Sequence, residues 1–193
     1  MSCPQQAVDK LWKVWITLWI DKQKAVDNAV KRGGEAGMII RNEQEALQVA
    51  VEMERRAIRV YERALTVAGS QSAREAVEEI LRDEREHLTR FSAMLERLGG
   101  ETAEEPALIQ AMAADALFPG GVMGMAREDA LDDLKSVYRY AVDSERRAVE
   151  QYGDFARRCE EPAVKNAFLD VAREETIHLA SLWERLTALE AEK

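Results

Sequence analysis

Apolar positions recur every three or four residues along most of the 193-residue chain, which is the spacing of one face of an α-helix. The pattern predicts four long helices, over about residues 42–68, 70–99, 127–159 and 162 to nearly the C-terminus. Asn42 with Glu45 three residues later indicates a capping box at the first start, and Gly69 and Gly99-Gly100 indicate the first two ends. A short helix over 106–118 is expected between the second and third long helices.

The lengths of the connections predict how the helices are arranged. Short links join the first helix to the second and the third to the fourth, so each pair is expected to form an antiparallel hairpin. The middle connection, roughly 27 residues long, is long enough to return the chain along the bundle. We therefore expect an all-α fold over residues 42–193, a four-helix bundle in which a long crossover joins two hairpins.

Residues 1–41 follow a different pattern and are predicted to be an N-terminal helical arm with a glycine-rich linker. Trp12, Trp15 and Trp19 stand at helical spacing in the arm, and residues 32–37 form the linker. The arm is expected to pack on the bundle or on a second subunit, because exposed aromatic residues of this density are uncommon. Docking into a larger shell or a partner protein is an alternative. Another is a helix on a membrane surface, disfavoured by the acidic balance of the chain, with its basic residues Lys10, Lys13, Lys22 and Lys24 toward anionic lipid.

Composition and charge exclude several classes of protein. The chain is 47% hydrophobic and 33% charged, which is typical of a globular protein, and its 27 basic and 36 acidic residues give a net charge of −9. This balance argues against nucleic acid as the main partner. The two cysteines, Cys3 and Cys159, form no Cys-x-x-Cys pair, so we expect neither a disulfide framework nor a zinc or iron–sulfur site. With no signal peptide and no apolar run long enough to span a bilayer, a cytoplasmic protein is expected.

An internal repeat places the same polar residues in both halves, 91 residues apart. Glu54-Arg55-Arg56-Ala57 recurs at residues 145–148, and Tyr61 recurs as Tyr152. Glu84-x-x-His87 recurs as Glu175-x-x-His178, which accounts for both histidines of the chain. The two halves are predicted to be one helical hairpin used twice, related by an approximate two-fold axis.

The repeated glutamates and histidines lie on the apolar faces of their helices. Around Glu54 the neighbours three, four and seven positions away are Leu47, Ala50, Val51, Ala57, Ile58 and Tyr61. Around Glu84 and His87 they are Val77, Ile80, Leu81, Leu88 and Phe91, and the second half repeats this pattern around Glu145, Glu175 and His178. One carboxylate per helix and both histidines are thus predicted to point into the core. No arginine is predicted to share these faces.

Four carboxylates buried without positive charge are untenable, because each would cost several kcal/mol or take up a proton. Two divalent cations would balance them. The Glu and His of each Glu-x-x-His pair lie one turn apart, so both reach one dinuclear site. Each metal would take one imidazole, one carboxylate from the first or third helix, and shared bridging carboxylates. Oxygen and imidazole ligands suit iron(II) or manganese(II), whereas calcium, zinc and copper(I) are disfavoured.

At these residues the sequence resembles the ferritin-like diiron carboxylate superfamily, which uses this ligand pattern. Over about residues 42–193 it is most similar to the helical domain of the rubrerythrins. The resemblance implies terminal iron ligands at Glu54 and Glu145, bridging ligands at Glu84 and Glu175, and one histidine per iron at His87 and His178. It also implies that hydrogen peroxide or dioxygen oxidises a diferrous centre held by these six residues.

The sequence departs from the rubrerythrin pattern at two places. Ala148 stands where rubrerythrins carry a further carboxylate, so the six-ligand set is closer to that of bacterioferritin. The rubredoxin-type domain is absent, so electrons are expected from another protein or from ferrous iron.

Some polar neighbours have alternative interpretations. Tyr61 and Tyr152 are interpreted either as hydrogen-bond donors to ligand carboxylates or as core aromatics. Four other acidic residues, most of them expected to be solvated, are candidate partners of the ligands: Asp83, Asp143, Asp170 and Glu174.

Three functions are compatible with this pattern. We favour a rubrerythrin-like oxidoreductase that reduces hydrogen peroxide or dioxygen, in a homodimer or a higher homo-oligomer. The first alternative is a ferroxidase that feeds iron storage in a cage. The second is a membrane-associated diiron quinone hydroxylase, in which the arm would contact the bilayer.

Overall fold

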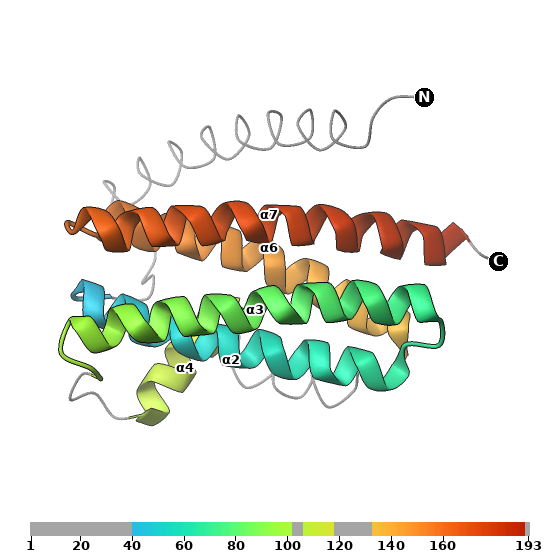
Figure 1. The fold of residues 1–193 in the computed structure, drawn as a ribbon, viewed down its shortest axis with the longest axis horizontal. Coiled ribbons are helices and arrows are strands. Elements are labelled where there is room, and N and C mark those ends of the chain that lie inside the picture. Colours follow the sequence, from blue (N-terminus) through green and yellow to red (C-terminus); the bar gives the residue numbers. More distant parts are fainter. Residues whose placement is uncertain (1–39, 102–105, 118–132, 192–193) are drawn as a thin grey trace, which may run out of the picture. The chain divides into compact units, whose positions relative to one another are not determined.

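Five α-helices account for the regular structure in the part of the chain that the computed structural model describes, residues 40–101, 106–117 and 133–191. They are α2 (Glu43–Val67), α3 (Gln71–Arg97), α4 (Pro106–Leu117), α6 (Leu134–Arg158) and α7 (Pro162–Ala191) (Figure 1). The predicted all-α fold is confirmed. The predicted arm lies outside the described residues except for Ile40 and Arg41.

The ends of the first hairpin follow from capping. Asn42 accepts a hydrogen bond from the Glu45 N–H at 2.8 Å and so starts α2. The Glu45 carboxylate accepts from the Arg41 N–H at 2.6 Å rather than from that of Asn42, so the predicted capping box is displaced by one residue. After the last residue of α3, Gly99 and Gly100 adopt positive φ angles of 107° and 82°, which glycine tolerates and other residues rarely adopt.

The third long helix begins later than predicted. Asp133, which lies inside the predicted helix over 127–159, has an extended backbone and is the N-cap of α6. Its side chain accepts a hydrogen bond from the Ser136 N–H at 3.0 Å. Apolar spacing alone did not reveal this cap, since the spacing continues across Asp133. Residues 127–132 of the predicted helix lie outside the described part of the chain.

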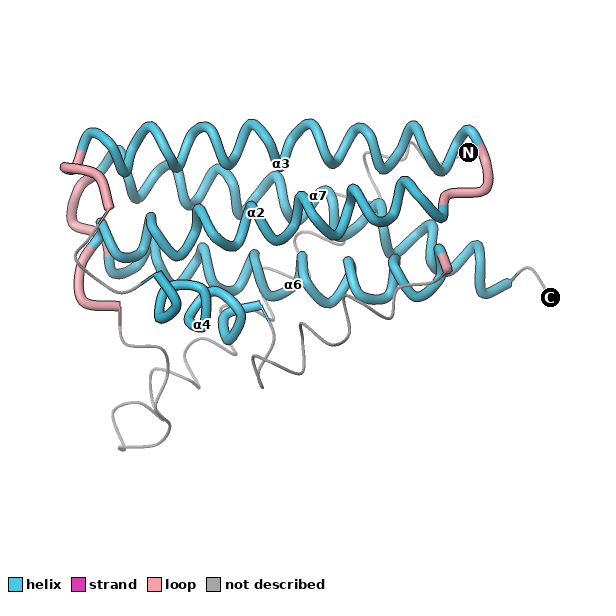
Figure 2. Tube along the Cα trace, turned by 90° about the horizontal axis from the view of Figure 1, so that it is seen from below, coloured by secondary structure: helices cyan, strands magenta, loops and turns pink. Residues whose placement is uncertain are grey.

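The four long helices pack as two hairpins, α2 with α3 and α6 with α7 (Figure 2). Between the hairpins, α2 packs against α6, and contact between α3 and α7 is less extensive. The short helix α4 contacts both α2 and α6 and buries Ile109, Ala113 and Ala114. The α2–α6 side of the bundle is therefore covered, and the cavities described below lie on the α3–α7 side.

An aromatic cluster fills one part of the core. It consists of Phe91, Tyr152, Phe155 and Phe168, all nearly inaccessible to solvent. The ring centroid of Phe168 lies 5.1 Å from that of Phe91 and 5.3 Å from that of Phe155, within the range of favourable aromatic packing. The cluster joins α3, α6 and α7.

No helix in the described part of the chain is long and apolar enough to cross a membrane.

Replacing Phe168 by alanine should lower the free energy of unfolding of the metal-free protein by about 3–5 kcal/mol, because it leaves a cavity in this cluster. Trp183→Ala, on the same helix but 61% exposed, should change it by less than about 0.5 kcal/mol. Urea unfolding followed by circular dichroism measures both. Equal midpoints for the two variants would contradict the assignment of Phe168 to a packed core.

Candidate metal centre

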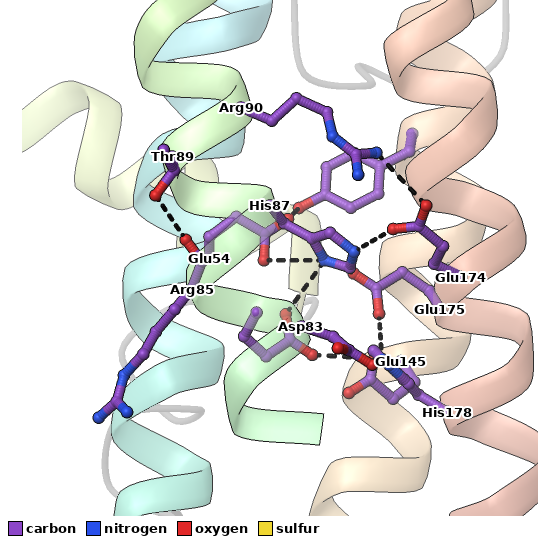
Figure 3. A network of polar contacts seen from close by, with 12 residues as sticks. Glu54, Asp83, Arg85, His87, Thr89, Arg90, Glu145, Glu174, Glu175 and His178 are labelled. Atoms are coloured by element: carbon purple, nitrogen blue, oxygen red, sulfur yellow. Dashed lines mark hydrogen bonds and ion pairs between the residues drawn. The ribbon is translucent and has the colours of Figure 1, made fainter. Parts of the chain in front are cut away.

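The six predicted ligands come together in the middle of the bundle. Glu54 comes from α2, Glu145 from α6, and the two Glu-x-x-His pairs from α3 and α7 (Figure 3). Each is at most 5% exposed. They form two groups with mutually close ligand atoms, all within 4.8 Å of one another in each group. The groups are Glu54, Glu84, His87 and Glu175, and Glu84, Glu145, Glu175 and His178.

Glu84 and Glu175 belong to both groups because each spans the two histidines. One oxygen of Glu175 lies 3.1 Å from Nδ1 of His87, and the other lies 2.8 Å from Nδ1 of His178. The oxygens of Glu84 lie 3.6 Å and 3.4 Å from the same two nitrogens. This is the arrangement that two carboxylates bridging a pair of metal ions would need.

The outer carboxylates accept hydrogen bonds from the two repeated tyrosines. Tyr152 donates to Glu54 at 2.5 Å, and Tyr61 donates to Glu145. Each tyrosine thus serves the glutamate of the other half of the repeat. Of the two interpretations of these tyrosines, the geometry agrees with hydrogen-bond donation to the candidate ligands.

Two of the four acidic neighbours hold the outer ring nitrogens of the histidines. Glu174 lies 2.6 Å from Nε2 of His87, and Asp83 lies 3.3 Å from Nε2 of His178. Both pairs cross between α3 and α7, and both acids are 40% exposed. These bonds leave the Nδ1 atoms facing the bridging carboxylates.

Most of the four acidic neighbours were expected to be solvated, but Asp83 and Glu174 bind the candidate histidine ligands. The signal that could have found them is the repeat itself, since they too are 91 residues apart. The remaining two candidates form surface ion pairs, Asp143 with Arg146 and Asp170 with Arg173.

In the absence of metal, burial and neighbouring charges shift the pKa values of the side chains in the centre. Burial, with the nearby carboxylates of Glu84 and Glu175, raises the pKa of Glu54 well above its usual value. Burial and the same two carboxylates also raise the pKa of Glu145. Burial alone would lower the pKa of His87, but the carboxylates of Glu175 and Glu84 outweigh it and raise this pKa to about 12. For the same reasons the pKa of His178 is raised. The metal-free centre therefore favours protonated imidazoles, and the raised pKa values of Glu54 and Glu145 favour their neutral forms.

The residues present fit a pair of divalent cations. Both oxygens of Glu84 and Nδ1 of His87 are buried without a hydrogen-bond partner, which is costly unless something else binds them. Four carboxylates and two imidazoles form a hard, mixed oxygen and nitrogen donor set suited to iron(II) or manganese(II). Of these two residues, Glu84 belongs to both ligand groups and His87 to one.

The buried face of α2 differs from the predicted one in two details. Arg56 of α2 is buried, although no arginine was predicted on the inward faces, and Ala57 and Ile58 are only half-buried. The buried face of α2 is thus rotated from the predicted one.

Cys159 is a buried free thiol whose burial raises its pKa to about 11, which disfavours a nucleophilic role.

Glu84→Gln should abolish binding of two metal ions per chain while the metal-free bundle still folds. The reason is that the substitution keeps the shape of the side chain but removes the carboxylate that faces both histidines. Metal analysis and urea unfolding measure the two effects, with Glu86→Gln, an exposed site on the same helix, as the control. Retention of two ions by Glu84→Gln would contradict the role of Glu84.

Metal affinity should rise with pH across the neutral range. Because the pKa values of His87, His178, Glu54 and Glu145 are all raised in the metal-free centre, protons compete with metal ions and acid weakens binding. Loading the centre with two ions should release roughly two to four protons per chain. Calorimetric titration with cobalt(II) in buffers of different ionisation enthalpy counts them, and an affinity independent of pH would contradict these protonation states.

Comparisons with known proteins agree with this geometry. A sequence profile of the rubrerythrin family matches residues 16–95. No curated protein matches the sequence. Among solved structures, the chain is similar to the bacterioferritin-related protein from Bacteroides fragilis, described as a dodecameric thioferritin. The two share 21% sequence identity with a TM-score of 0.60, over 77% of this chain and 86% of that chain, a likeness that bears on the fold. The chain therefore has a ferritin-like helical fold, and residues 16–95 resemble the rubrerythrin family.

Proposed function

We propose that the chain is a non-haem diiron oxidoreductase that reduces hydrogen peroxide. Six residues would hold two ferrous ions, with manganese as the alternative metal: Glu54, Glu84, His87, Glu145, Glu175 and His178. The observation that carries this proposal is that Glu84 and Glu175 each direct one oxygen to each histidine, which favours two adjacent ions over one.

Two ferrous ions bound there would supply two electrons, which with two protons reduce one molecule of hydrogen peroxide to two molecules of water. The protein supplies the surroundings of this reaction. Tyr61 and Tyr152 donate hydrogen bonds from their hydroxyl groups to the carboxylates of Glu145 and Glu54. These bonds fix the orientation of the two outer ligands. Glu174 and Asp83 hold the Nε2 protons of the histidines, which leaves the Nδ1 lone pairs for the ions.

The size of the nearby cavity favours a small oxidant. The cavity that reaches His178 measures about 160 Å³, below the ~300–1,000 Å³ typical of pockets for organic ligands. A larger cavity of about 510 Å³ is lined by none of the six candidate ligands. This supports peroxide or dioxygen as the substrate and disfavours the quinone hydroxylase.

A ferroxidase that feeds iron storage is the second candidate. It is favoured by the likeness of the fold to a protein described as a dodecameric thioferritin. The electrons would then come from ferrous iron as substrate, whereas the peroxidase needs an external electron donor. Light scattering separates a dimer or tetramer of the 21.8 kDa chain, expected for the enzyme, from a twelve-subunit shell, expected for storage.

The test is anaerobic loading of the metal-free protein with two ferrous ions per chain, followed by rapid mixing with hydrogen peroxide or with dioxygen. Diferric absorbance should appear at least about tenfold faster with peroxide. Glu84→Gln should show no such signal, and Glu86→Gln should behave as the wild type. Faster oxidation by dioxygen would overturn the peroxidase in favour of the ferroxidase.

A further inference from the structure

The two ligand groups have different surroundings although the repeat builds them alike. The aromatic cluster packs beside Glu54, since Tyr152 donates to that carboxylate and contacts Phe91 and Phe168. At the equivalent positions of the other half, 91 residues away, the repeat has smaller side chains. Leu182 corresponds to Phe91, Ala64 to Phe155 and Val77 to Phe168. One side of the centre is therefore walled by large aromatic rings and the other is not.

Solvent reaches the second group and not the first. His178, which is 5% exposed, forms part of the wall of the 160 Å³ cavity between α3 and α7, whereas His87 is fully buried and does not line it. His87 is further covered by Glu174, whose carboxylate binds Nε2 at 2.6 Å and lies 3.4 Å from Arg90 (Figure 3). Neither of the two cavities described is lined by His87.

The chemistry of this cavity suits a hydrated divalent cation. Glu79, Asp83 and Glu174 line it together with His178, and its lining among the described residues contains no lysine or arginine. Carboxylates of one sign in a partly enclosed space raise the local concentration of cations. The volume accommodates several water molecules, at ~30 Å³ each in the liquid, and therefore an ion with part of its hydration shell. The buried imidazole of His178 lies at its inner wall, next to the unpaired oxygens of Glu84.

We infer that the two metal positions exchange their ions at different rates. The position formed by Glu84, Glu145, Glu175 and His178 exchanges with solvent through the acidic cavity, and the position formed by Glu54, Glu84, Glu175 and His87 retains its ion. This inference rests on the proposed dinuclear site. It assigns the cavity to passage of divalent cations, and it makes Glu79 and Ser181, which bind neither ion, determinants of the exchange rate.

Release of cobalt(II) tests the inference without measuring catalysis. The full chain is loaded with two cobalt(II) ions and mixed with excess chelator, and the cobalt absorbance is followed in time. We expect two phases of equal amplitude whose rates differ at least about tenfold. Ser181→Leu, which narrows the cavity, should slow the fast phase at least about fivefold and leave the slow phase unchanged. The matched control, Ala163→Leu, lines the 510 Å³ cavity and should change neither phase.

Uptake of cobalt(II) gives a second readout that does not depend on packing. Glu79→Gln should slow uptake a few-fold at low ionic strength, and its exposed neighbour Glu78→Gln, which does not line the cavity, should not.

The outcomes separate this inference from the proposed function. Two bound ions that leave in a single phase, or a fast phase that Ser181→Leu leaves unchanged or Ala163→Leu slows equally, would overturn the inference alone. Binding of fewer than two ions per chain by the wild type would overturn the dinuclear site as well.

Discussion

Four carboxylates buried together impose the constraint on which the rest of this domain depends. Charges of one sign inside an apolar bundle repel one another and lose their hydration, so they persist only with compensating positive charge. Without metal, the two imidazoles supply that compensation, and the raised pKa values of Glu54 and Glu145 favour their neutral forms. The stripes of Leu, Val, Ala and Phe that drive helix packing also place these acids in the core, so the force that folds the bundle assembles the centre.

Several contacts around the centre run between the halves. Tyr61 binds Glu145 and Tyr152 binds Glu54, while Asp83 and Glu174 each hold the histidine of the opposite helix. Each hairpin thus receives part of its hydrogen bonding from the other. Correct orientation of every ligand therefore depends on the two hairpins having come together, which couples the geometry of the centre to tertiary packing.

Helical periodicity in the sequence was sufficient to predict the four long helices, the two hairpins and the six residues that gather in the core. These features depend on spacing along one helix, which the sequence records directly. The partners of Tyr61, Asp83 and Glu174 depend on how far one helix is rotated and shifted against another, which spacing does not contain. The late start of α6 had a different cause, since it rests on hydrogen bonds from the N–H and hydroxyl of Ser136 to the side chain of Asp133.

The crossed contacts have a consequence for how such a domain evolves. Two separate copies of a single hairpin, associated about a two-fold axis, would make all the same tyrosine, carboxylate and histidine contacts. A symmetric pair of this kind could not change one side of its centre without changing the other. Joined in one chain, the two halves can differ, and the equivalent positions of the repeat hold phenylalanine at position 155 and alanine at position 64. Covalent linkage is thus what permits two chemically distinct sides around one ligand set.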